Sequence, residues 1–313
     1  MRTQLPFAVL AAAFACSLAT TPANARARVF VASYGNDSNP CTFGSPCKTF
    51  QQAVNVVDAG GEVTAIDSAG FGPIFIKHAV TITSPPGVEA GIVPSGNNTA
   101  IIVDTTAPTD AIVLRGLTLN GSGIGTTGIN FIYGKSLVVE NCVISNFSGS
   151  GIALSPDVPA PVSLVVTNTI VADNGGHGIY VQPDANTTVV HATFNRVQVY
   201  DNGDRGVGLY GNFMFNPAGL SAIIIDSVAA NNGVNYYALG NGNPNTFLRI
   251  FRSVSFGATT TNGFRDIVAE GGARISVSQS NLEDGSWGNS LVSSYGDNYT
   301  GGVGTGGSVI SKE

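Results

Sequence analysis

Two stretches of the chain, 28 residues apart, carry charged side chains at matching positions. Asp173 corresponds to Asp201, His177 corresponds to Arg205, and Asp204 adjoins Arg205. Two neighbouring carboxylates repel each other, and a divalent cation such as Ca²⁺ or a shared proton relieves that repulsion. Histidine, aspartate and arginine together can move protons on a substrate. The spacing therefore predicts a metal pair at Asp173 and Asp201 and a catalytic group of His177, Asp204 and Arg205. An exposed ladder of solvated side chains is the alternative.

Four aromatic residues fall in two irregular segments that follow these stretches. They are Phe213, Phe215, Tyr236 and Tyr237. Flat rings beside polar asparagine residues are a common way to hold the face of a sugar. We predict that the four rings bind a carbohydrate substrate. The alternative is that Phe213 and Phe215 fold back as an apolar plug over the neighbouring coils.

The element that must position these residues is a unit of about 27 residues, which repeats most clearly over residues 116–279. Most units contain a glycine turn that leads into an apolar residue, and a period of this length is typical of a solenoid. The chain holds 40 glycines and only 11% charged residues, beside abundant Val, Ile and Thr. This composition favours buried parallel strands separated by tight turns. We predict an all-β fold, a right-handed parallel β-helix with three short strands per coil.

Polar residues recur at two places in each unit and should stack at the corners of the coils. The predicted columns are Asn141, Asn168, Asn195 and Asp226 at one corner, and Asn146, Asn174, Asn202 and Asn232 at another. Asparagine tolerates unusual backbone conformations, and its amide can hydrogen-bond to the next coil. We therefore interpret both columns as structural.

The chain begins with the features of a secretory signal peptide, predicted over residues 1–25. Arg2 provides the positive start, residues 7–18 the apolar run, and Ala23-Asn24-Ala25 a small-residue cleavage site. We expect residues 26–313 to form a single β-helix domain that is secreted, periplasmic or held at the cell surface. No later segment is apolar for long enough to span a membrane.

Residues 29–61 are predicted to form an N-terminal cap containing a helix over about 49–59. Thr49 and Gln52 have the spacing of a capping box, and an apolar face repeats with helical period. Such a helix would cover the open end of the core and block strand pairing there.

Cysteine spacing predicts one disulfide. Cys41 and Cys47 lie six residues apart in a loop rich in Pro, Gly and Ser, and an exported chain favours their oxidation. Cys142 lies within a repeat, in the context of a strand, and is interpreted as a small buried apolar residue. No Cys/His spacing resembles a zinc site.

Charge and motif content exclude several functional classes. The net charge is −6 and there is no cluster of Lys or Arg, which disfavours binding to nucleic acid or an anionic membrane. The chain has only three histidines and no Gly-x-Ser-x-Gly motif, so a hydrolytic triad is not expected. The oligomeric state is left open.

Three motifs near the N-terminus resemble those of secreted pectate-lyase-like β-helix proteins. They read Gly35-Asn36-Asp37-Ser38-Asn39-Pro40, Lys48-Thr49-Phe50-Gln51 and Gly60-Gly61-Glu62-Val63. The later repeats are similar to the generic coils of this family, so the resemblance covers nearly all of the chain after the signal. It implies the fold. Because the fold carries lyases, hydrolases, epimerases, adhesins and phage spikes, it leaves the activity open.

Gly176-His177-Gly178 resembles the Gly-His-Gly of polygalacturonases, which contains a catalytic histidine. The two carboxylates that hydrolysis requires are missing, because Ile170 follows Asn168-Thr169 and the chain has no Asp-Asp pair. The layout is more similar to that of polysaccharide lyases with this fold, in which acidic residues hold Ca²⁺ and Lys or Arg abstracts a proton. This resemblance implies that Arg205 is the base, which requires a pKa far below its ordinary value of about 12 or more.

We therefore predict an exported β-helix protein that binds or acts on an extracellular polysaccharide. If it is an enzyme, the residues favour a lyase over a hydrolase, although they make no complete catalytic constellation. The competing hypothesis is a non-catalytic structural or adhesive scaffold of the cell envelope.

Overall fold

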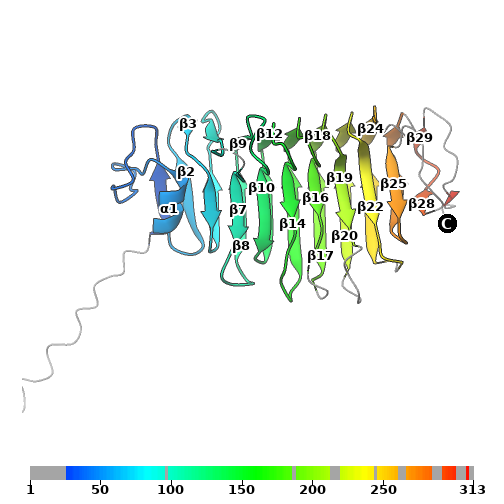
Figure 1. The fold of residues 1–313 in the computed structure, drawn as a ribbon, viewed down its shortest axis with the longest axis horizontal. Coiled ribbons are helices and arrows are strands. Elements are labelled where there is room, and N and C mark those ends of the chain that lie inside the picture. The colour runs from blue at the N-terminus through cyan, green and yellow to red at the C-terminus, as the bar shows by residue number, and fades with distance from the viewer. Residues whose placement is uncertain are drawn as a thin grey trace, which may run out of the picture.

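The structure, a computed structural model, describes nearly the whole chain after the N-terminal segment. The described residues are 26–95, 98–184, 188–211, 219–242, 245–259, 266–283, 291–300 and 308–309. As predicted, they form a right-handed parallel β-helix with three strands per coil. Figure 1 shows the strands side by side along one long axis, running from the N-terminal end (blue) to the last strands (red).

The described strands form three parallel sheets, one on each side of the coil. Sheet 1 consists of β1 (Arg28–Val31), β2 (Gly61–Ala65), β5 (Val80–Thr83), β8 (Ala111–Arg115), β11 (Ser136–Glu140), β14 (Val162–Thr167), β17 (Val190–Asn195), β20 (Leu220–Ile225), β23 (Thr246–Phe251), β26 (Arg274–Ser278), β28 (Val292–Ser294) and β30 (Ser308–Val309). Sheet 2 consists of β3 (Ala69–Gly70), β6 (Ala90–Ile92), β9 (Leu117–Asn120), β12 (Val143–Ser145), β15 (Ile170–Ala172), β18 (Gln198–Tyr200), β21 (Val228–Ala230), β24 (Val254–Phe256), β27 (Asn281–Leu282) and β29 (Tyr299–Thr300). Sheet 3 consists of β4 (Ile74–Ile76), β7 (Ile101–Asp104), β10 (Ile129–Tyr133), β13 (Ile152–Leu154), β16 (Ile179–Val181), β19 (Arg205–Tyr210), β22 (Val234–Leu239) and β25 (Ile267–Glu270).

Alternation of side chains along the strands builds the core. In β14, for example, Val162, Leu164 and Val166 point inward and are buried, whereas the residues between them face outward. Each buried Val, Leu or Ile contributes roughly 1.5–3 kcal/mol by leaving water. Because the register of neighbouring coils is regular, inward residues stack on inward residues along the whole axis.

The corner between sheets 1 and 2 is a column of residues in the left-handed backbone conformation. The column consists of Gly116, Asn141, Asn168, Arg196, Asp226, Arg252 and Gln279. The prediction is confirmed for Asn141, Asn168 and Asp226 but is wrong by one residue at Asn195, which ends β17 instead. Arg196 takes the corner there and donates a hydrogen bond from Nε to Asn168 Oδ1 at 2.6 Å.

Gly116 divides the apolar stretch of residues 112–119. Its φ of +70° turns the chain, and a Cβ at this position would lie 2.4 Å from the carbonyl oxygen of Ser84. The stretch is therefore two strands, β8 and β9, on different sheets. A run of apolar residues does not reveal this corner, because both strands are equally apolar.

The corner between sheets 2 and 3 contains two columns instead of the single predicted one. Asn146, Asp173, Asp201, Asn231 and Gly257 hold the left-handed conformation. The next residue in three of these coils is a buried asparagine of the ladder Asn174, Asn202 and Asn232. The prediction that Asn146 belongs to the ladder is wrong, because Phe147 takes that position and its N–H donates to Asn174 Oδ1 at 3.1 Å.

Helix α1 (Phe50–Val56) covers the N-terminal end of the core. As predicted, the Thr49 hydroxyl accepts a hydrogen bond from the Gln52 N–H, at 3.2 Å. The helix ends earlier than the expected residue 59, because Val57 has an extended backbone conformation. Phe50 and Val54 are buried in the main hydrophobic core, which places the apolar face of α1 over the first coil. Among the described helices, none is long and apolar enough to cross a membrane.

The predicted disulfide between Cys41 and Cys47 is present. Its loop lies along the outer edge of β1, where Phe30 N donates to Cys41 O at 2.8 Å and Cys47 N donates to Phe30 O at 3.0 Å. At the end of sheet 1 it is therefore this loop, and not the predicted helix, that satisfies the edge of the first strand.

Candidate functional site

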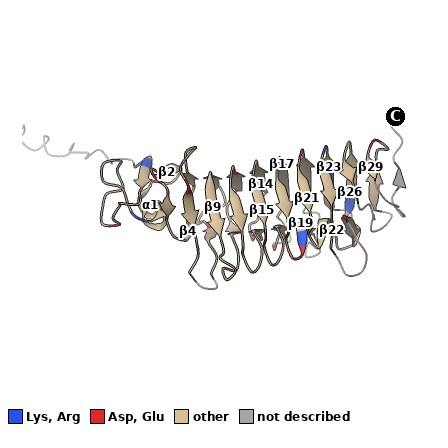
Figure 2. Ribbon diagram, turned by 90° about the horizontal axis from the view of Figure 1, so that it is seen from above, with Lys and Arg blue, Asp and Glu red and all other residues tan. Residues whose placement is uncertain are grey.

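The start of β19 and the turn before β16 bring the predicted catalytic residues together. Ile179 pairs with Val207, and the N–H of Gly178 donates to the carbonyl of Arg205 at 2.9 Å. This register places His177 directly over Arg205, as the repeat predicts. Figure 2 shows that charged residues are few along the strands and that acidic and basic residues meet at the start of β19.

His177 lies between a carboxylate and a phenol. Its Nδ1 is 3.1 Å from Asp204 Oδ2, although the alignment is too poor for a full hydrogen bond. Its Nε2 is 2.9 Å from the hydroxyl of Tyr210. If Nδ1 carries the proton and faces Asp204, Nε2 accepts from the Tyr210 hydroxyl. The imidazole is thus hydrogen-bonded to the phenol through Nε2 and lies close to the carboxylate through Nδ1.

Arg205 completes the charged part of the site. Its Nη1 is hydrogen-bonded to Asp204 Oδ1, and its guanidinium carbon lies 4.7 Å from the centre of the Tyr237 ring. The cation is thus held by an ion pair on one side and an aromatic face on the other. The side chain of Arg205 is 30% exposed and that of Asp204 is 39% exposed, so both remain in reach of a ligand.

Three tyrosine rings form a ladder on the outward face of sheet 3. The ring centres of Tyr180 and Tyr210 are 4.9 Å apart, and those of Tyr210 and Tyr237 are 5.3 Å apart. Gly208 lies between Tyr180 and Tyr237 in the strand register. A Cβ at Gly208 would lie 2.8 Å from the Tyr210 ring, so the glycine leaves the space that this ring fills.

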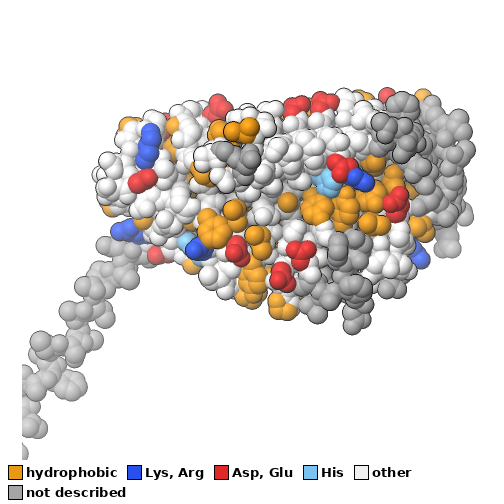
Figure 3. All heavy atoms as spheres, viewed as in Figure 1, with side chains coloured by type: hydrophobic (Ala, Val, Ile, Leu, Met, Phe, Trp, Pro, Cys, Tyr) orange, Lys and Arg blue, Asp and Glu red, His pale blue; other side chains and the backbone are white. Residues whose placement is uncertain are grey.

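The ladder ends at β25. The Tyr237 hydroxyl donates to Glu270 Oε2 at 2.8 Å, and Val268 packs beside the Tyr237 ring. Tyr237 is only 5% exposed, and its buried ring packs against both Arg205 and Tyr210. Figure 3 shows the result on this face, where one histidine and neighbouring charged side chains border an apolar patch.

The surroundings of His177 and Tyr210 shift the pKa values of these two groups in opposite directions. Burial lowers the pKa of His177, and this effect, together with Arg205, outweighs the opposing attraction of Asp204. Burial raises the pKa of Tyr210 despite the nearby Arg205 cation. At neutral pH the site therefore holds a neutral imidazole, which can accept a proton, beside a protonated phenol, which can donate one.

Arg205 keeps its charge in this setting. Burial alone would lower its pKa, but Tyr210, Asp204 and Tyr237 together raise it. This direction is opposite to the one that the role of base requires. Arg205 is suited to hold an anion, and His177 is the group suited to accept a proton.

Asp173 and Asp201 stack at the second corner, on the other side of the turn from His177. Both are exposed and both have a left-handed backbone, with φ of 56° and 54°. Aspartate and asparagine adopt this conformation more readily than other residues, which accounts for the acidic type without a metal. Among the described residues, no group of three or more His, Cys, Asp or Glu side chains could hold a metal ion.

The structure describes two of the four predicted sugar-binding rings, and these two point to opposite faces of β22. Phe213 and Phe215 lie outside the described residues. Tyr236 points into the core and is 1% exposed, which does not fit the expected contact with a sugar. Of the two predicted rings that the structure describes, Tyr237 belongs to the ladder and Tyr236 does not.

Sequence reasoning missed Tyr180, Gly208 and Tyr210. The signal was present, because the residue two positions after each sheet 3 turn faces outward. Aligning Gly178-Ile179-Tyr180 with Asn235-Tyr236-Tyr237 assigns Tyr236 to the core and Tyr180 to the surface. Tyr210 is harder to find, because its ring reaches back over Gly208 and only coordinates show that contact.

Comparison with known proteins agrees with this architecture. Residues 90–216 match the family described as the right handed beta helix region. The chain therefore has the fold of a right-handed parallel β-helix. A solved pectate lyase, Pel9A, shares the fold with a TM-score of 0.58 and 17% identity, over 86% of this chain and 80% of that one.

Two further solved structures show weaker likeness. A rhamnogalacturonan lyase has a TM-score of 0.48 and 12% identity, over 80% of this chain and 74% of its own. The A-module of the Azotobacter vinelandii mannuronan C-5 epimerase AlgE4 has a TM-score of 0.42 and 12% identity, over 80% of this chain and 91% of its own. No curated protein matches the chain in sequence.

Proposed function

We propose that this protein binds an acidic polysaccharide across the outward face of sheet 3 and cleaves it by β-elimination. One observation carries the proposal: a neutral imidazole, His177, lies between Asp204 and the Tyr210 hydroxyl, with the Arg205 cation beside them. The site is open, as a polymeric substrate requires. The fold likeness to a pectate lyase supports the class of substrate.

β-Elimination in a uronate polymer needs three groups. A base removes the proton from the carbon that bears the carboxylate, the bond from the neighbouring carbon to the leaving oxygen breaks, and an acid protonates that oxygen. A cation must stabilise the negative charge that develops on the carboxylate. The product carries a new carbon–carbon double bond.

Each of these roles has a candidate in the site. His177 Nε2 accepts the proton, and Asp204 stabilises the imidazolium that results. Arg205 holds the carboxylate as a charged partner. Tyr210, whose hydroxyl turns away from Nε2 as the imidazole takes up its proton, donates to the leaving oxygen.

Binding along the chain would come from the tyrosine ladder. Tyr180 and Tyr210 are partly exposed on the same face and offer apolar ring surface beside the charged groups. Such a surface suits the apolar face of a sugar ring. We further propose that the protein is exported, on the basis of the signal-like residues 1–25 and the Cys41–Cys47 disulfide.

The first prediction tests the acid. Tyr210→Phe keeps the ring in the ladder and removes only the hydroxyl, so it should lower the rate of β-elimination by about 10²-fold or more. The measurement is the ultraviolet absorbance of unsaturated products from polygalacturonate and other uronate polymers. Tyr180→Phe is the matched control and should keep the rate within about twofold, because among the described residues its hydroxyl has no hydrogen-bond partner.

Equal loss in both variants would contradict the role of Tyr210. If the wild-type protein released no unsaturated product from any uronate polymer, and these polymers did not retard it in affinity gels, the function would be that of a structural or adhesive scaffold.

A further inference from the structure

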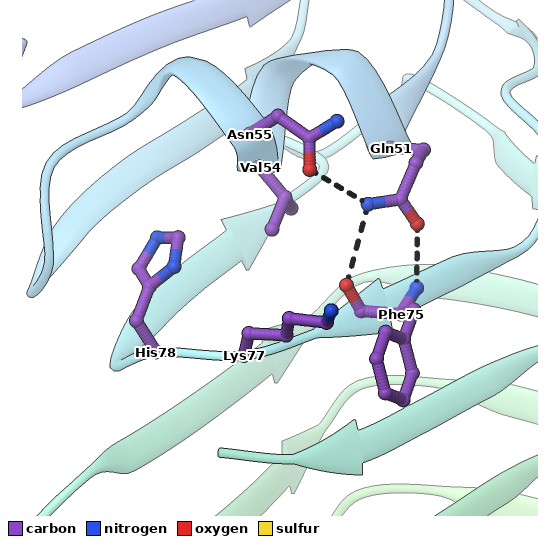
Figure 4. A pocket seen from close by; sticks show the side chains of 6 residues that line it. All are labelled: Gln51, Val54, Asn55, Phe75, Lys77 and His78. Carbon is purple, nitrogen blue, oxygen red and sulfur yellow. Dashed lines mark hydrogen bonds between the residues drawn. The ribbon is translucent and has the colours of Figure 1, made fainter. Parts of the chain in front are cut away.

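A second polar site lies at the N-terminal end of sheet 3, about four coils from the tyrosine ladder. It is a pocket of about 420 Å³ between α1 and the end of β4. Gln51, Val54 and Asn55 line it from the helix, and Phe75, Lys77 and His78 line it from the strand and the turn after it. Figure 4 shows Lys77 and His78 on the strand side, across from Val54 and Asn55.

Both polar atoms of the Gln51 side chain are hydrogen-bonded within the protein. Its Oε1 accepts from Phe75 N at 2.7 Å, and its Nε2 donates to Phe75 O at 3.3 Å. The side chain therefore acts as a short piece of strand that finishes the edge of β4. Asn55 Oδ1 accepts a third hydrogen bond from Gln51 Nε2, at 3.0 Å, which turns the Asn55 amide and leaves its Nδ2 as a donor.

The remaining polar groups of the pocket have no such partner. Lys77 Nζ lies 4.9 Å from the centre of the Phe75 ring, and within the described part of the chain no carboxylate pairs with it. The Nε2 atom of His78 is buried and makes no hydrogen bond among the described residues. A buried ring nitrogen without a partner is rare in native proteins, so His78 Nε2 retains the capacity to hydrogen-bond to a ligand.

We propose that this pocket binds one carboxylate-bearing sugar unit of the polysaccharide. Lys77 provides the charge for the carboxylate, and Asn55 Nδ2 and His78 Nε2 provide hydrogen bonds to the carboxylate or to hydroxyl groups. Val54 and the Phe75 ring provide apolar surface for the ring of the sugar. Lys77 is exposed at the pocket and forms no ion pair among the described residues, so its charge is available to an anion.

The inference rests on the proposed function for the kind of polymer, and the strand register supports a continuous path between the two sites. Phe75 pairs with Ile102, and the same outward column continues through Asn130 and Ala153 to Tyr180. Four coils at ~4.8 Å separate Phe75 from Tyr180, or roughly 19 Å. A single polysaccharide chain that follows this face can reach both sites.

The test is a titration of the full-length protein with digalacturonate, followed by the backbone amide signals in NMR. Signals at residues 51–55 and 75–78 report the pocket, and signals at residues 177–181 and 205–210 report the ladder. Lys77→Gln removes the charge, and Asn55→Asp keeps the acceptor for Gln51 while placing a carboxylate in the pocket. Each should weaken binding at the pocket at least fivefold and leave the ladder signals unchanged.

Two controls match these changes in charge. Lys135→Gln removes a surface cation elsewhere, and Gln52→Glu adds a carboxylate to α1 outside the pocket, so both should keep pocket binding within about twofold. The inference is overturned if pocket signals do not move, or if Lys77→Gln and Lys135→Gln weaken them equally. If the ladder signals shift and the pocket signals do not, the proposed function stands and this inference fails. If the pocket signals shift but the protein releases no unsaturated product, the pocket stands and the proposed β-elimination fails.

Discussion

At the scale of single residues, His177 decides what the site can do, because its neighbours act on its pKa in opposite directions. Burial lowers the pKa, Asp204 raises it and Arg205 lowers it. A second prediction follows: in an NMR titration His177 loses its proton below pH 6.5, and Asp204→Asn lowers its pKa further, because the attraction of the carboxylate for the imidazolium is removed. A value for His177 at or above 6.5 would contradict the burial that the structure shows.

The lowered pKa of His177 also makes the stability of the folded chain depend on pH. Below about pH 6.5 the unfolded chain binds a proton at position 177 that the folded chain binds less readily. Stability therefore falls as the pH drops from 6.5 towards the folded pKa of His177. His177→Gln removes this contribution, so the variant should lose less stability than the wild type over that range.

The third prediction concerns Asp173, whose left-handed backbone explains its residue type. Asp173→Asn keeps the preference for this conformation and removes one of two stacked charges, so the melting temperature should stay the same or rise. Thermal unfolding with and without Ca²⁺ checks it. A rise in the wild-type melting temperature on adding Ca²⁺, lost in the variant, would instead establish the metal pair that the spacing suggests.

Residue types alone predicted part of this site. The 28-residue step placed His177 over Arg205 correctly, because stacking depends only on the length of the coil. The step could not show that the phenol of Tyr210 lies on His177, because that contact depends on the small size of Gly208 in the same strand.

At the scale of elements, the buried asparagine ladder is the feature that fixes one coil on the next. Asn202 Oδ1 accepts from Asn174 N and Nδ2, and Asn202 Nδ2 donates to Val171 O at 3.1 Å and to Asn232 Oδ1 at 2.9 Å. The side chain is 2% exposed, so water cannot replace these bonds.

The fourth prediction is that Asn202→Ala lowers the free energy of unfolding by about 3 kcal/mol, because it leaves buried donors and acceptors unpaired. Asn130→Ala is the control, since Asn130 faces outward on β10 and should change stability by less than about 0.5 kcal/mol. Denaturant unfolding measures both. A loss below about 1 kcal/mol for Asn202→Ala would mean that the ladder does not stabilise the stack.

The sequence patterns predicted the inward-facing strand positions more accurately than the corners at which the strands end. Inward positions were predictable, because strand alternation and the repeat agree. The corner columns were predicted one residue off at Asn146 and Asn195. Arginine, aspartate and asparagine all occupy left-handed positions in this chain, so residue type alone does not show which of two adjacent polar residues forms the corner.

At the scale of the whole molecule, a solenoid must protect the strand edges at its ends. The Cys41–Cys47 loop does so for sheet 1, by pairing with Phe30 and by an Ala32 N–H to Cys47 O bond of 3.0 Å. Without this loop, β1 would offer a free edge to another chain. The disulfide holds the loop closed in the unfolded chain as well, which is worth roughly 2 kcal/mol for so short a loop.

The fifth prediction is that the double variant Cys41→Ser with Cys47→Ser has a lower melting temperature and associates as its concentration rises, because β1 is uncovered. Light scattering after size exclusion measures the association. Cys142→Ala is the control: this thiol is buried inside a coil, its pKa is raised to about 11 by burial, and its loss uncovers no edge. If the double variant stays at the size of the wild type at every concentration, the loop is not what protects the edge. The protecting element would then be α1, because its Gln51 already hydrogen-bonds to the backbone at the edge of β4.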